Sequence, residues 1–223
     1  MSGARDIRVV LFDLDGTFAD TLPDLRDALG EALAEQGLDG VSADFLRPIV
    51  SLGARVMAER ACDQRLDEAS MKIVLKRFLE LYRSNVARHT RLMSGISDLL
   101  EALEARGIAW GIVTNKRREW TDPLMRVLDR EARAVCIVSG DSTANAKPHP
   151  QPLLHACRLA GVPPSSCVYV GDAENDVVAA RRAGMRSVAV SYGYIADGDD
   201  PRAWGADTII DAPEDLLAWL DAA

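Results

Sequence analysis

The sequence contains few histidines and cysteines and lacks a long hydrophobic run. Its three histidines are scattered, which argues against a histidine metal site or a Ser-His-Asp triad. Its four cysteines show no Cys-x-x-Cys spacing, so we interpret them as reduced packing residues and not as a zinc site or a disulfide framework. No apolar run is long enough to span a bilayer, and residues 1–6 carry no signal-peptide core. We therefore expect a cytoplasmic protein with no membrane partner.

The sequence also lacks a basic cluster. Lysine and arginine together number 26 against 34 acidic residues, which gives a formal charge of −8. The densest basic stretch, Lys116-Arg117-Arg118, is followed by Glu119, and we interpret it as the solvated start of a helix. We expect no nucleic-acid partner, because such proteins concentrate positive charge on one face. An anionic substrate would need positive charge gathered at one point. The oligomeric state stays open.

Strand-like and helix-like patterns alternate regularly from residue 95 onward. We expect strands at 108–113, 135–138, 167–170, 187–190 and 208–210, and helices at 97–106, 123–128, 152–159, 174–183 and 213–220. Asp122 is the expected N-cap of the second helix, with Pro123 in its first turn. Together with the apolar run Val9-Val10-Leu11-Phe12, this alternation predicts an α/β fold: a doubly wound parallel sheet with the first strand central.

The stretch from about residue 22 to 89 interrupts this alternation. Its patterns are helical throughout: Leu25, Leu29 and Leu33 recur every four residues, and further helix-like stretches cover 50–61 and 73–82. An all-helical insertion after the first strand indicates a second, smaller domain. We therefore expect an α/β core made of residues 1–21 and 90–223 and an α-helical domain made of residues 22–89.

Two carboxylates stand directly behind the first strand, in the motif Asp13-Leu14-Asp15-Gly16-Thr17. In open α/β sheets the reactive crevice lies beyond the carboxyl ends of the strands, so both carboxylates arrive there together. Carboxylates held this close repel each other unless a cation or a shared proton intervenes. The motif is compatible with a metal site, with a nucleophile beside an acid/base partner, or with a simple strand-to-loop turn.

Further polar residues follow at later strand ends. Thr114-Asn115 follows the second strand, Lys147 precedes a helical pattern, and Gly171-Asp172 ends another strand four residues before Asp176. Each has an ordinary alternative, since Thr114 and Asp172 could cap helices and Lys147 could be a solvated lysine. Their common position at strand ends and loops favours one shared site.

Taken in order, these motifs resemble those of the haloacid dehalogenase superfamily, and within it the phosphatases. The resemblance implies a Rossmann-like core with an α-helical cap that closes over the active site. It implies that Asp13 is the nucleophile, which forms an aspartyl phosphate, and that Asp15 is the general acid and base. It also implies one Mg²⁺ held by Asp13, the backbone carbonyl of Asp15 and Asp172.

The same resemblance assigns the remaining site residues. Thr114, Asn115 and Lys147 would bind the phosphoryl group, while Asp176 and Thr17 would support the site, Asp176 by orienting Lys147 or a metal-bound water. Dehalogenases of the superfamily lack the second aspartate, so Asp15 favours phosphate chemistry. A sugar phosphomutase, which uses the same core motifs, stays an alternative.

The substrate implied is a small phosphomonoester. The arrangement is similar to the phosphoglycolate phosphatase branch. Gly53-Ala54-Arg55, Tyr192 to Ile195 and Trp204 to Asp207 resemble a bacterial subgroup that acts on N-acetylmuramic acid 6-phosphate. Both substrates carry a carboxylate, which Arg55, expected in a cap loop behind Gly53, could bind. The alternative for Arg55 is a solvated arginine on a cap helix.

Overall fold

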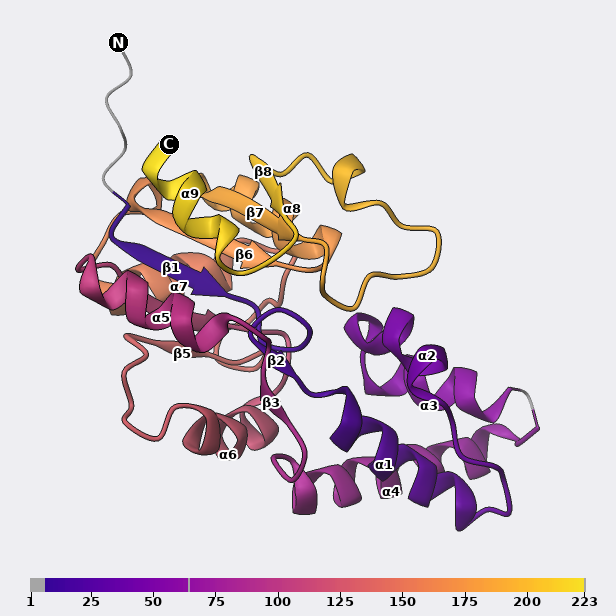
Figure 1. Ribbon diagram of the computed structural model, residues 1–223. Helices are drawn as coiled ribbons and strands as arrows, with labels where there is room; N and C mark the ends of the chain where they lie inside the picture. The colour runs from indigo at the N-terminus through magenta and orange to yellow at the C-terminus, as the bar shows by residue number, and fades with distance from the viewer. Residues whose placement is uncertain (1–6, 64, 223) are drawn as a thin grey trace.

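A sheet of six parallel strands lies at the centre of the computed structural model, which describes residues 7–63 and 65–222 (Figure 1). The strand order is β5-β4-β1-β6-β7-β8. The strands are β1 (Val9–Phe12), β4 (Ala109–Val113), β5 (Ile137–Val138), β6 (Cys167–Gly171), β7 (Arg186–Val190) and β8 (Thr208–Ile210). Phe12 lies opposite Ile112 of β4 and Val170 of β6. The predicted doubly wound parallel sheet with an interior first strand is confirmed.

Helices cover both faces of this sheet, which explains why β1 is apolar at every position. Val10 and Phe12 belong to a hydrophobic cluster with α5 (Ile96–Ala105), α6 (Arg118–Leu128) and α9 (Asp215–Ala222). Val9 and Leu11 point to the other face, where they cluster with α7 (Gln151–Ala160) and α8 (Glu174–Ala183). A strand buried on both faces reads as a continuous hydrophobic run instead of an alternating one.

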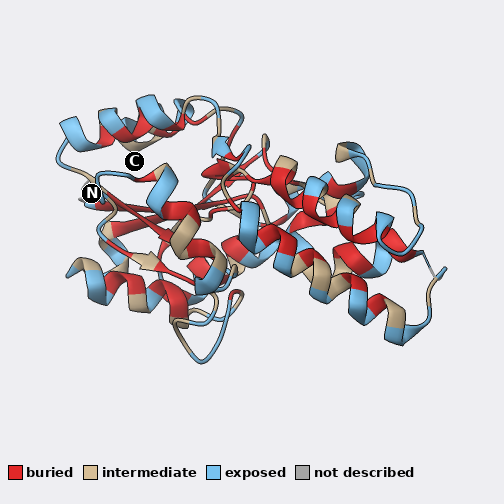
Figure 2. Cartoon of the chain, turned by 90° about the horizontal axis from the view of Figure 1, so that it is seen from below, coloured by how far each residue is buried: buried red, intermediate tan, exposed pale blue. Residues whose placement is uncertain are grey.

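The segment between β1 and β4 contributes a group of helices that Figure 1 shows to one side of the sheet. They are α1 (Leu22–Ala34), α2 (Ala43–Leu46), the 3₁₀ helix Arg47–Leu52, α3 (Ala54–Cys62) and α4 (Glu68–Asn85). Buried residues line the inner faces of these helices as they line the sheet (Figure 2). Within 22–63 and 65–89 the chain forms no strand. We call residues 22–89 the helical insertion, and its action as a separate cap stays a proposal.

Two short connections join the helical insertion to the core, and neither was predicted from the sequence. β2 (Ala19–Asp20) and β3 (Arg91–Leu92) pair antiparallel just outside the two ends of the insertion. The buried carboxylate of Asp24 accepts hydrogen bonds from the backbone N–H groups of His89 and Thr90, at 2.8 and 2.9 Å, and from the Thr90 hydroxyl at 2.7 Å. Asp24 therefore ties the start of the insertion to its end.

The predicted start of the helix at 123 is wrong. Helix α6 begins at Arg118 and contains Pro123 in its interior, so Asp122 is not its N-cap. The backbone N–H of Arg118 instead donates to the carboxylate of Asp141 at 2.9 Å, a cap supplied from 23 residues further along the chain. Proline is tolerated in a helix mainly in the first turn, so Pro123 predicted a helix that begins near residue 122. The helix begins earlier because Asp141, which is distant in the sequence, caps it at Arg118.

The predicted helix at 50–61 is also wrong, because the chain breaks at Gly53. Gly53 has φ +92°, a conformation that favours glycine, and it separates the 3₁₀ helix from α3. The other expected strands and helices from 97 onward lie within two residues of the observed bounds. Two further 3₁₀ helices span Pro164–Ser166 and Pro201–Ala203. In the described part of the chain, no helix combines the length and apolar character needed to cross a membrane.

Candidate active site

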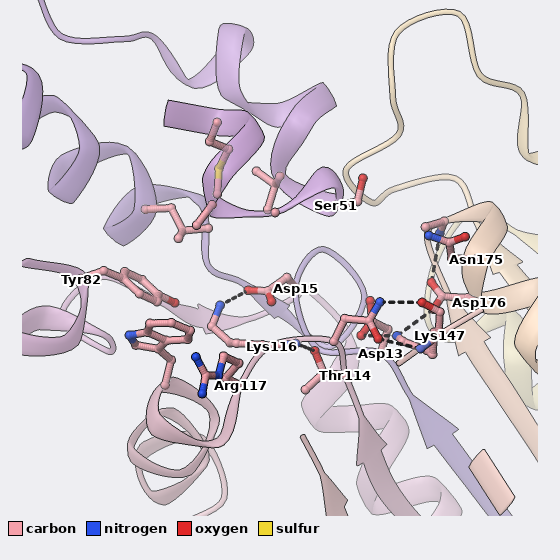
Figure 3. Close-up of a pocket in the computed structure, with 18 of the residues that line it drawn as sticks. Asp13, Asp15, Ser51, Tyr82, Thr114, Lys116, Arg117, Lys147, Asn175 and Asp176 are labelled. Carbon is pink, nitrogen blue, oxygen red and sulfur yellow. Dashed lines mark hydrogen bonds and ion pairs between the residues drawn. The ribbon is translucent and has the colours of Figure 1, made fainter. Parts of the chain in front are cut away.

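The carboxyl ends of β1, β4 and β6 meet at one edge of the sheet, where a pocket of about 190 Å³ opens beneath the helical insertion. Core residues from the predicted motifs line this pocket: Asp13, Asp15, Thr114, Asn115, Lys147 and Asp176 (Figure 3). The insertion contributes mainly apolar walls from Leu25, Val50, Gly53, Met57 and Leu79, together with Tyr82. The structure thus brings most of the predicted site together.

Lys147 lies at the centre of the core part of the site. Its ammonium group is 2.8 Å from Asp13 Oδ1, 2.8 Å from Asp176 Oδ1 and 2.7 Å from the hydroxyl oxygen of Tyr169. An ammonium has three N–H donors, so these contacts use all of them. Burial alone lowers the pKa of Lys147, but the charges of Asp13 and Asp176 outweigh it and raise the pKa. Lys147 is therefore a fixed positive charge beside Asp13.

Asp172 is held in a narrow space behind Asp13. A Cβ atom at Gly16 or at Gly193 would collide with the Asp172 side chain, and Gly16 also has φ +82°. Asp172 Oδ2 accepts a hydrogen bond from the backbone N–H of Tyr194 at 2.7 Å. Its other oxygen, Oδ1, is buried and has no hydrogen-bond partner among the described residues. An unpartnered buried carboxylate oxygen is costly, which indicates that a ligand completes this site.

The site holds more carboxylates than cationic side chains. Carboxylate oxygens of Asp13, Asp172 and Asp176 all lie within 4.8 Å of one another. Burial, followed by the neighbouring carboxylates, raises the pKa of Asp172 well above its usual value, and burial raises the pKa of Asp13 to about 6. Asp176 already has partners for both oxygens, because Oδ2 accepts from the N–H of Ala173 at 3.1 Å. The oxygen donors left for a metal are on Asp13 and Asp172, which fits the predicted Mg²⁺.

Asp15 lies on the other side of the pocket and contacts Lys116. The Lys116 ammonium is 2.6 Å from Asp15 Oδ1, which also accepts a hydrogen bond from the hydroxyl of Thr21. The side chain of Lys116 is 8% exposed, so its interpretation as part of a solvated stretch is wrong. Burial alone lowers the pKa of Lys116, but the charge of Asp15 outweighs it and raises the pKa. The described part of the pocket therefore contains two lysine–aspartate pairs that are largely shielded from solvent.

Comparison with known proteins agrees with this geometry. The family model described as haloacid dehalogenase-like hydrolase matches residues 10–190. This chain belongs to the haloacid dehalogenase-like hydrolases. It is 41% identical over 216 residues to a phosphoglycolate phosphatase of Xanthomonas campestris pv. campestris, with 97% of this chain and 96% of the relative covered. It is 38% identical over 217 residues to the N-acetylmuramic acid 6-phosphate phosphatase of Pseudomonas putida, with 97% of both chains covered.

The fold of this haloacid dehalogenase-like hydrolase also matches a solved structure. A crystal structure of a predicted phosphoglycolate phosphatase from Haemophilus somnus superposes with a TM-score of 0.86 at 31% identity. The match covers 96% of this chain and 98% of the other. The helical insertion therefore has a counterpart in a solved structure, because a match of this extent includes residues 22–89 together with the sheet.

Thr114 and Asn115 of the hydrolase lie at the end of β4, as predicted, but they differ in what they offer a ligand. The Thr114 hydroxyl oxygen accepts a hydrogen bond from the N–H of Lys116 at 3.1 Å. The Asn115 side chain donates to the carbonyl of Lys147 at 3.0 Å and accepts from its N–H at 2.9 Å. Asn115 therefore holds the Lys147 backbone in place, and one N–H of its amide group remains for a ligand.

Two further predicted residues lie away from the pocket. Thr17 is buried, its hydroxyl has no hydrogen-bond partner among the described residues, and it does not line the pocket. Arg55 lies in the first turn of α3 and not in a loop, so that expectation is wrong. Its side chain is 70% exposed and pairs with Glu59 at 2.7 Å. Gly53 lines the pocket, whereas Arg55 does not.

Sequence reasoning missed several residues of this hydrolase that the structure places at the site. Lys116 belongs to a basic stretch whose other members, Arg117 and Arg118, are exposed, and the signal that marks it as a pocket residue is its position two residues after Thr114. Tyr169 alternates with Val168 and Val170 on β6 and looked like a core residue, yet its hydroxyl donates to the carbonyl of Val113 at 2.6 Å and accepts from Lys147. No local pattern distinguishes such a tyrosine from a packing residue.

Proposed function

We propose that this protein is a Mg²⁺-dependent phosphoric monoester hydrolase that acts through an aspartyl phosphate on Asp13. The observation that carries the proposal is that the two neighbouring aspartates, Asp13 and Asp15, have different surroundings. Asp13 pairs with Lys147 and has an oxygen within 4.8 Å of an Asp172 oxygen, whereas Asp15 pairs with Lys116 on the other side of the pocket. Each aspartate has a lysine partner, but Asp13 also belongs to the carboxylate cluster that would hold a metal, so we assign the attack on phosphorus to Asp13 and the proton transfers to Asp15.

In the first half of the reaction, an Asp13 oxygen attacks phosphorus and forms a new P–O bond. The bond from phosphorus to the leaving oxygen breaks, and Asp15 supplies the proton that this oxygen needs. Lys147 offsets the negative charge that Asp13 and the phosphoryl group share. Because its three donors already have partners, we assign Lys147 to charge neutralisation, and Thr114 with the neighbouring backbone N–H groups to phosphoryl binding.

In the second half, Asp15 removes a proton from water, which attacks phosphorus and releases Asp13 and inorganic phosphate. The aspartyl phosphate must be protected from uncontrolled water until this step. The helical insertion forms the apolar side of the pocket, so we assign it the role of a cap. Asp24 and the β2–β3 pair are the connections about which such a cap would move.

The residues that would hold Mg²⁺ are Asp13 and Asp172 through their side chains and Asp15 through its backbone carbonyl. Asp176 acts beside them by orienting Lys147. Mg²⁺ bound there supplies charge neutralisation for the phosphoryl oxygens. The fit rests on the buried unpartnered Oδ1 of Asp172 and on the excess of carboxylates over cations around it.

We propose a small, carboxylate-bearing phosphomonoester such as 2-phosphoglycolate as the substrate. A pocket of about 190 Å³ is smaller than the roughly 300–1,000 Å³ typical of sites for drug-sized ligands, which favours a compact substrate. The two curated relatives above are named for phosphoglycolate and N-acetylmuramic acid 6-phosphate, so the latter is the alternative. A sugar phosphomutase is a further alternative. A cytoplasmic location and the absence of a nucleic-acid partner stay predictions from the sequence.

A substrate screen tests the proposal. Phosphate release should be measured on 2-phosphoglycolate, N-acetylmuramic acid 6-phosphate, hexose phosphates and an aryl phosphate, with Mg²⁺ and with EDTA. We expect hydrolysis that EDTA abolishes and added Mg²⁺ restores, with the highest efficiency on a carboxylate-bearing ester. Activity that survives exhaustive chelation would contradict the metal assignment, and interconversion of sugar phosphates with little phosphate release would favour the mutase.

A further inference from the structure

The leaving group of the substrate must lie on one particular side of the pocket. Asp15 protonates the leaving oxygen in the proposed reaction, so the rest of the leaving group extends past Asp15, away from Asp13. Figure 3 shows Tyr82, Lys116 and Arg117 on that side, opposite Lys147 and Asp176. The residues beyond Asp15 therefore determine which leaving group the protein accepts.

Two buried hydrogen-bond donors on this side have no acceptor in the described part of the chain. Tyr82, from α4, and Trp120, from α6, both line the pocket, and neither the Tyr82 hydroxyl proton nor the Trp120 indole N–H finds a hydrogen-bond acceptor among the described residues. The Lys116 ammonium lies 4.9 Å from the centre of the Tyr82 ring, but it can only donate, so it provides no acceptor for the tyrosine proton. Burial raises the pKa of Tyr82 to about 12, which keeps its hydroxyl protonated near neutral pH.

The surrounding charges suit an acceptor that is itself negative. Lys116 uses one contact on Asp15 and has further N–H donors. Arg117 lies at the rim with a 63% exposed side chain and only long contacts to Glu119 and Asp141, at 3.7 and 3.6 Å. Among the described residues that line the pocket, the carboxylates are Asp13, Asp15 and Asp176, and each has a cationic partner. Unsatisfied donors beside a lysine match a ligand carboxylate.

We propose that the Tyr82 hydroxyl and the Trp120 indole N–H, together with the Lys116 ammonium, bind the carboxylate of the substrate's leaving group. This subsite rests on the proposed phosphatase function and replaces Arg55 as the determinant of carboxylate specificity. It joins one residue of the helical insertion to two of the core, so substrate binding would also fix the insertion over the pocket. A site built around such donors rejects analogues that lack the matching acceptor.

The test compares matched substrates that differ in the carboxylate. Ethyl phosphate is 2-phosphoglycolate with a methyl group in place of the carboxylate, and N-acetylglucosamine 6-phosphate lacks the lactyl carboxylate of N-acetylmuramic acid 6-phosphate. The variants Tyr82→Phe and Trp120→Phe each remove one donor and retain a ring, with Arg55→Gln as an exposed control. For each enzyme, the ratio of kcat/KM values within a pair is measured on one sample, so the fraction of folded protein cancels.

We expect the unaltered enzyme to prefer the carboxylate-bearing member of at least one pair. Tyr82→Phe and Trp120→Phe should each lower that preference about tenfold to a hundredfold, the loss expected for one hydrogen bond to a charged group. Arg55→Gln should leave it unchanged. An unchanged preference in both aromatic variants, or no preference in the unaltered enzyme, would overturn the subsite but not the phosphatase function. Absence of Mg²⁺-dependent hydrolysis of any phosphomonoester would overturn the function itself.

Discussion

Without bound metal, the stability of the protein should depend on pH through Asp13. The pKa of this carboxyl is 3.8 in its reference state and about 6 in the fold, where burial is the largest cause of the increase. Because the folded state binds the proton more tightly than the unfolded chain, ionisation of Asp13 destabilises the fold. The stabilisation is fully present below pH 3.8 and is lost as the pH rises through about 6.

The size of this effect follows from the same two values. At about 1.4 kcal/mol per pH unit, a rise from 3.8 to about 6 corresponds to about 3 kcal/mol in total. Roughly half of it falls between about pH 5 and pH 8, so we expect the free energy of unfolding in EDTA to decrease by about 1.4 kcal/mol across that range through this group. Saturating Mg²⁺ favours the ionised carboxylate and should remove or reverse this decrease.

The assay is urea unfolding at several pH values, with EDTA and with Mg²⁺, on the unaltered protein and on Asp13→Asn. The asparagine has a similar size but does not titrate, so the difference between the two proteins isolates Asp13 from the other titrating groups. If Asp13→Asn shows the same pH dependence in EDTA as the unaltered protein, the reasoning is wrong. The same conclusion would follow if Mg²⁺ stabilised the unaltered protein equally at pH 5 and pH 8.

Three further substitutions test separate parts of the structure. Asp15→Asn should reduce hydrolysis of alkyl phosphates much more than hydrolysis of an aryl phosphate, because the aryl leaving group needs no proton. The difference between the two losses should be on the order of a hundredfold to ten-thousandfold. An equal loss on both substrates would argue against the acid/base role. Asp24→Ala removes the acceptor of three hydrogen bonds, two of them buried, and should lower the free energy of unfolding by about 3 kcal/mol in urea unfolding. A loss below about 1 kcal/mol would mean that water replaces them. Asp141→Ala removes the cap of α6 and should lower the free energy of unfolding by about 1 kcal/mol, checked by thermal unfolding. Asp39→Ala, which removes an exposed carboxylate, is the control for a general effect of losing a surface charge.

The sequence predicted the sheet well because its evidence is local. Val9 to Phe12 is apolar at every position since both faces of β1 are covered, and the spacing of the later strands leaves room for one helix between neighbours. The carboxyl-end rule then placed Asp13, Asp15, Thr114 and Asp172 at one edge without any knowledge of their distances. These residues could be predicted because each follows directly from the end of a recognisable strand.

Most of the wrong predictions concern features that depend on residues distant in the sequence. The start of α6 depends on Asp141, and the paired strands β2 and β3 are too short to show a periodic pattern. Lys116 is buried because Asp15 faces it, although its two neighbours in sequence are exposed. Arg55 was misplaced for a different reason: the local Gly53-Ala54-Arg55 pattern predicted a loop, whereas Arg55 lies in α3 and pairs with Glu59 one turn further along.

Chemical trapping of the phosphorylated enzyme tests the central claim most directly. The protein is mixed with Mg²⁺ and an excess of substrate, quenched in acid and reduced with borohydride, which converts an aspartyl phosphate to homoserine. The digested peptides are then read by mass spectrometry. We predict homoserine at position 13, dependent on substrate and absent from Asp13→Asn. Reduction at Asp15 or Asp172 instead, or no reduced aspartate in a protein that releases phosphate under the same conditions, would contradict the assignment of Asp13 as the nucleophile.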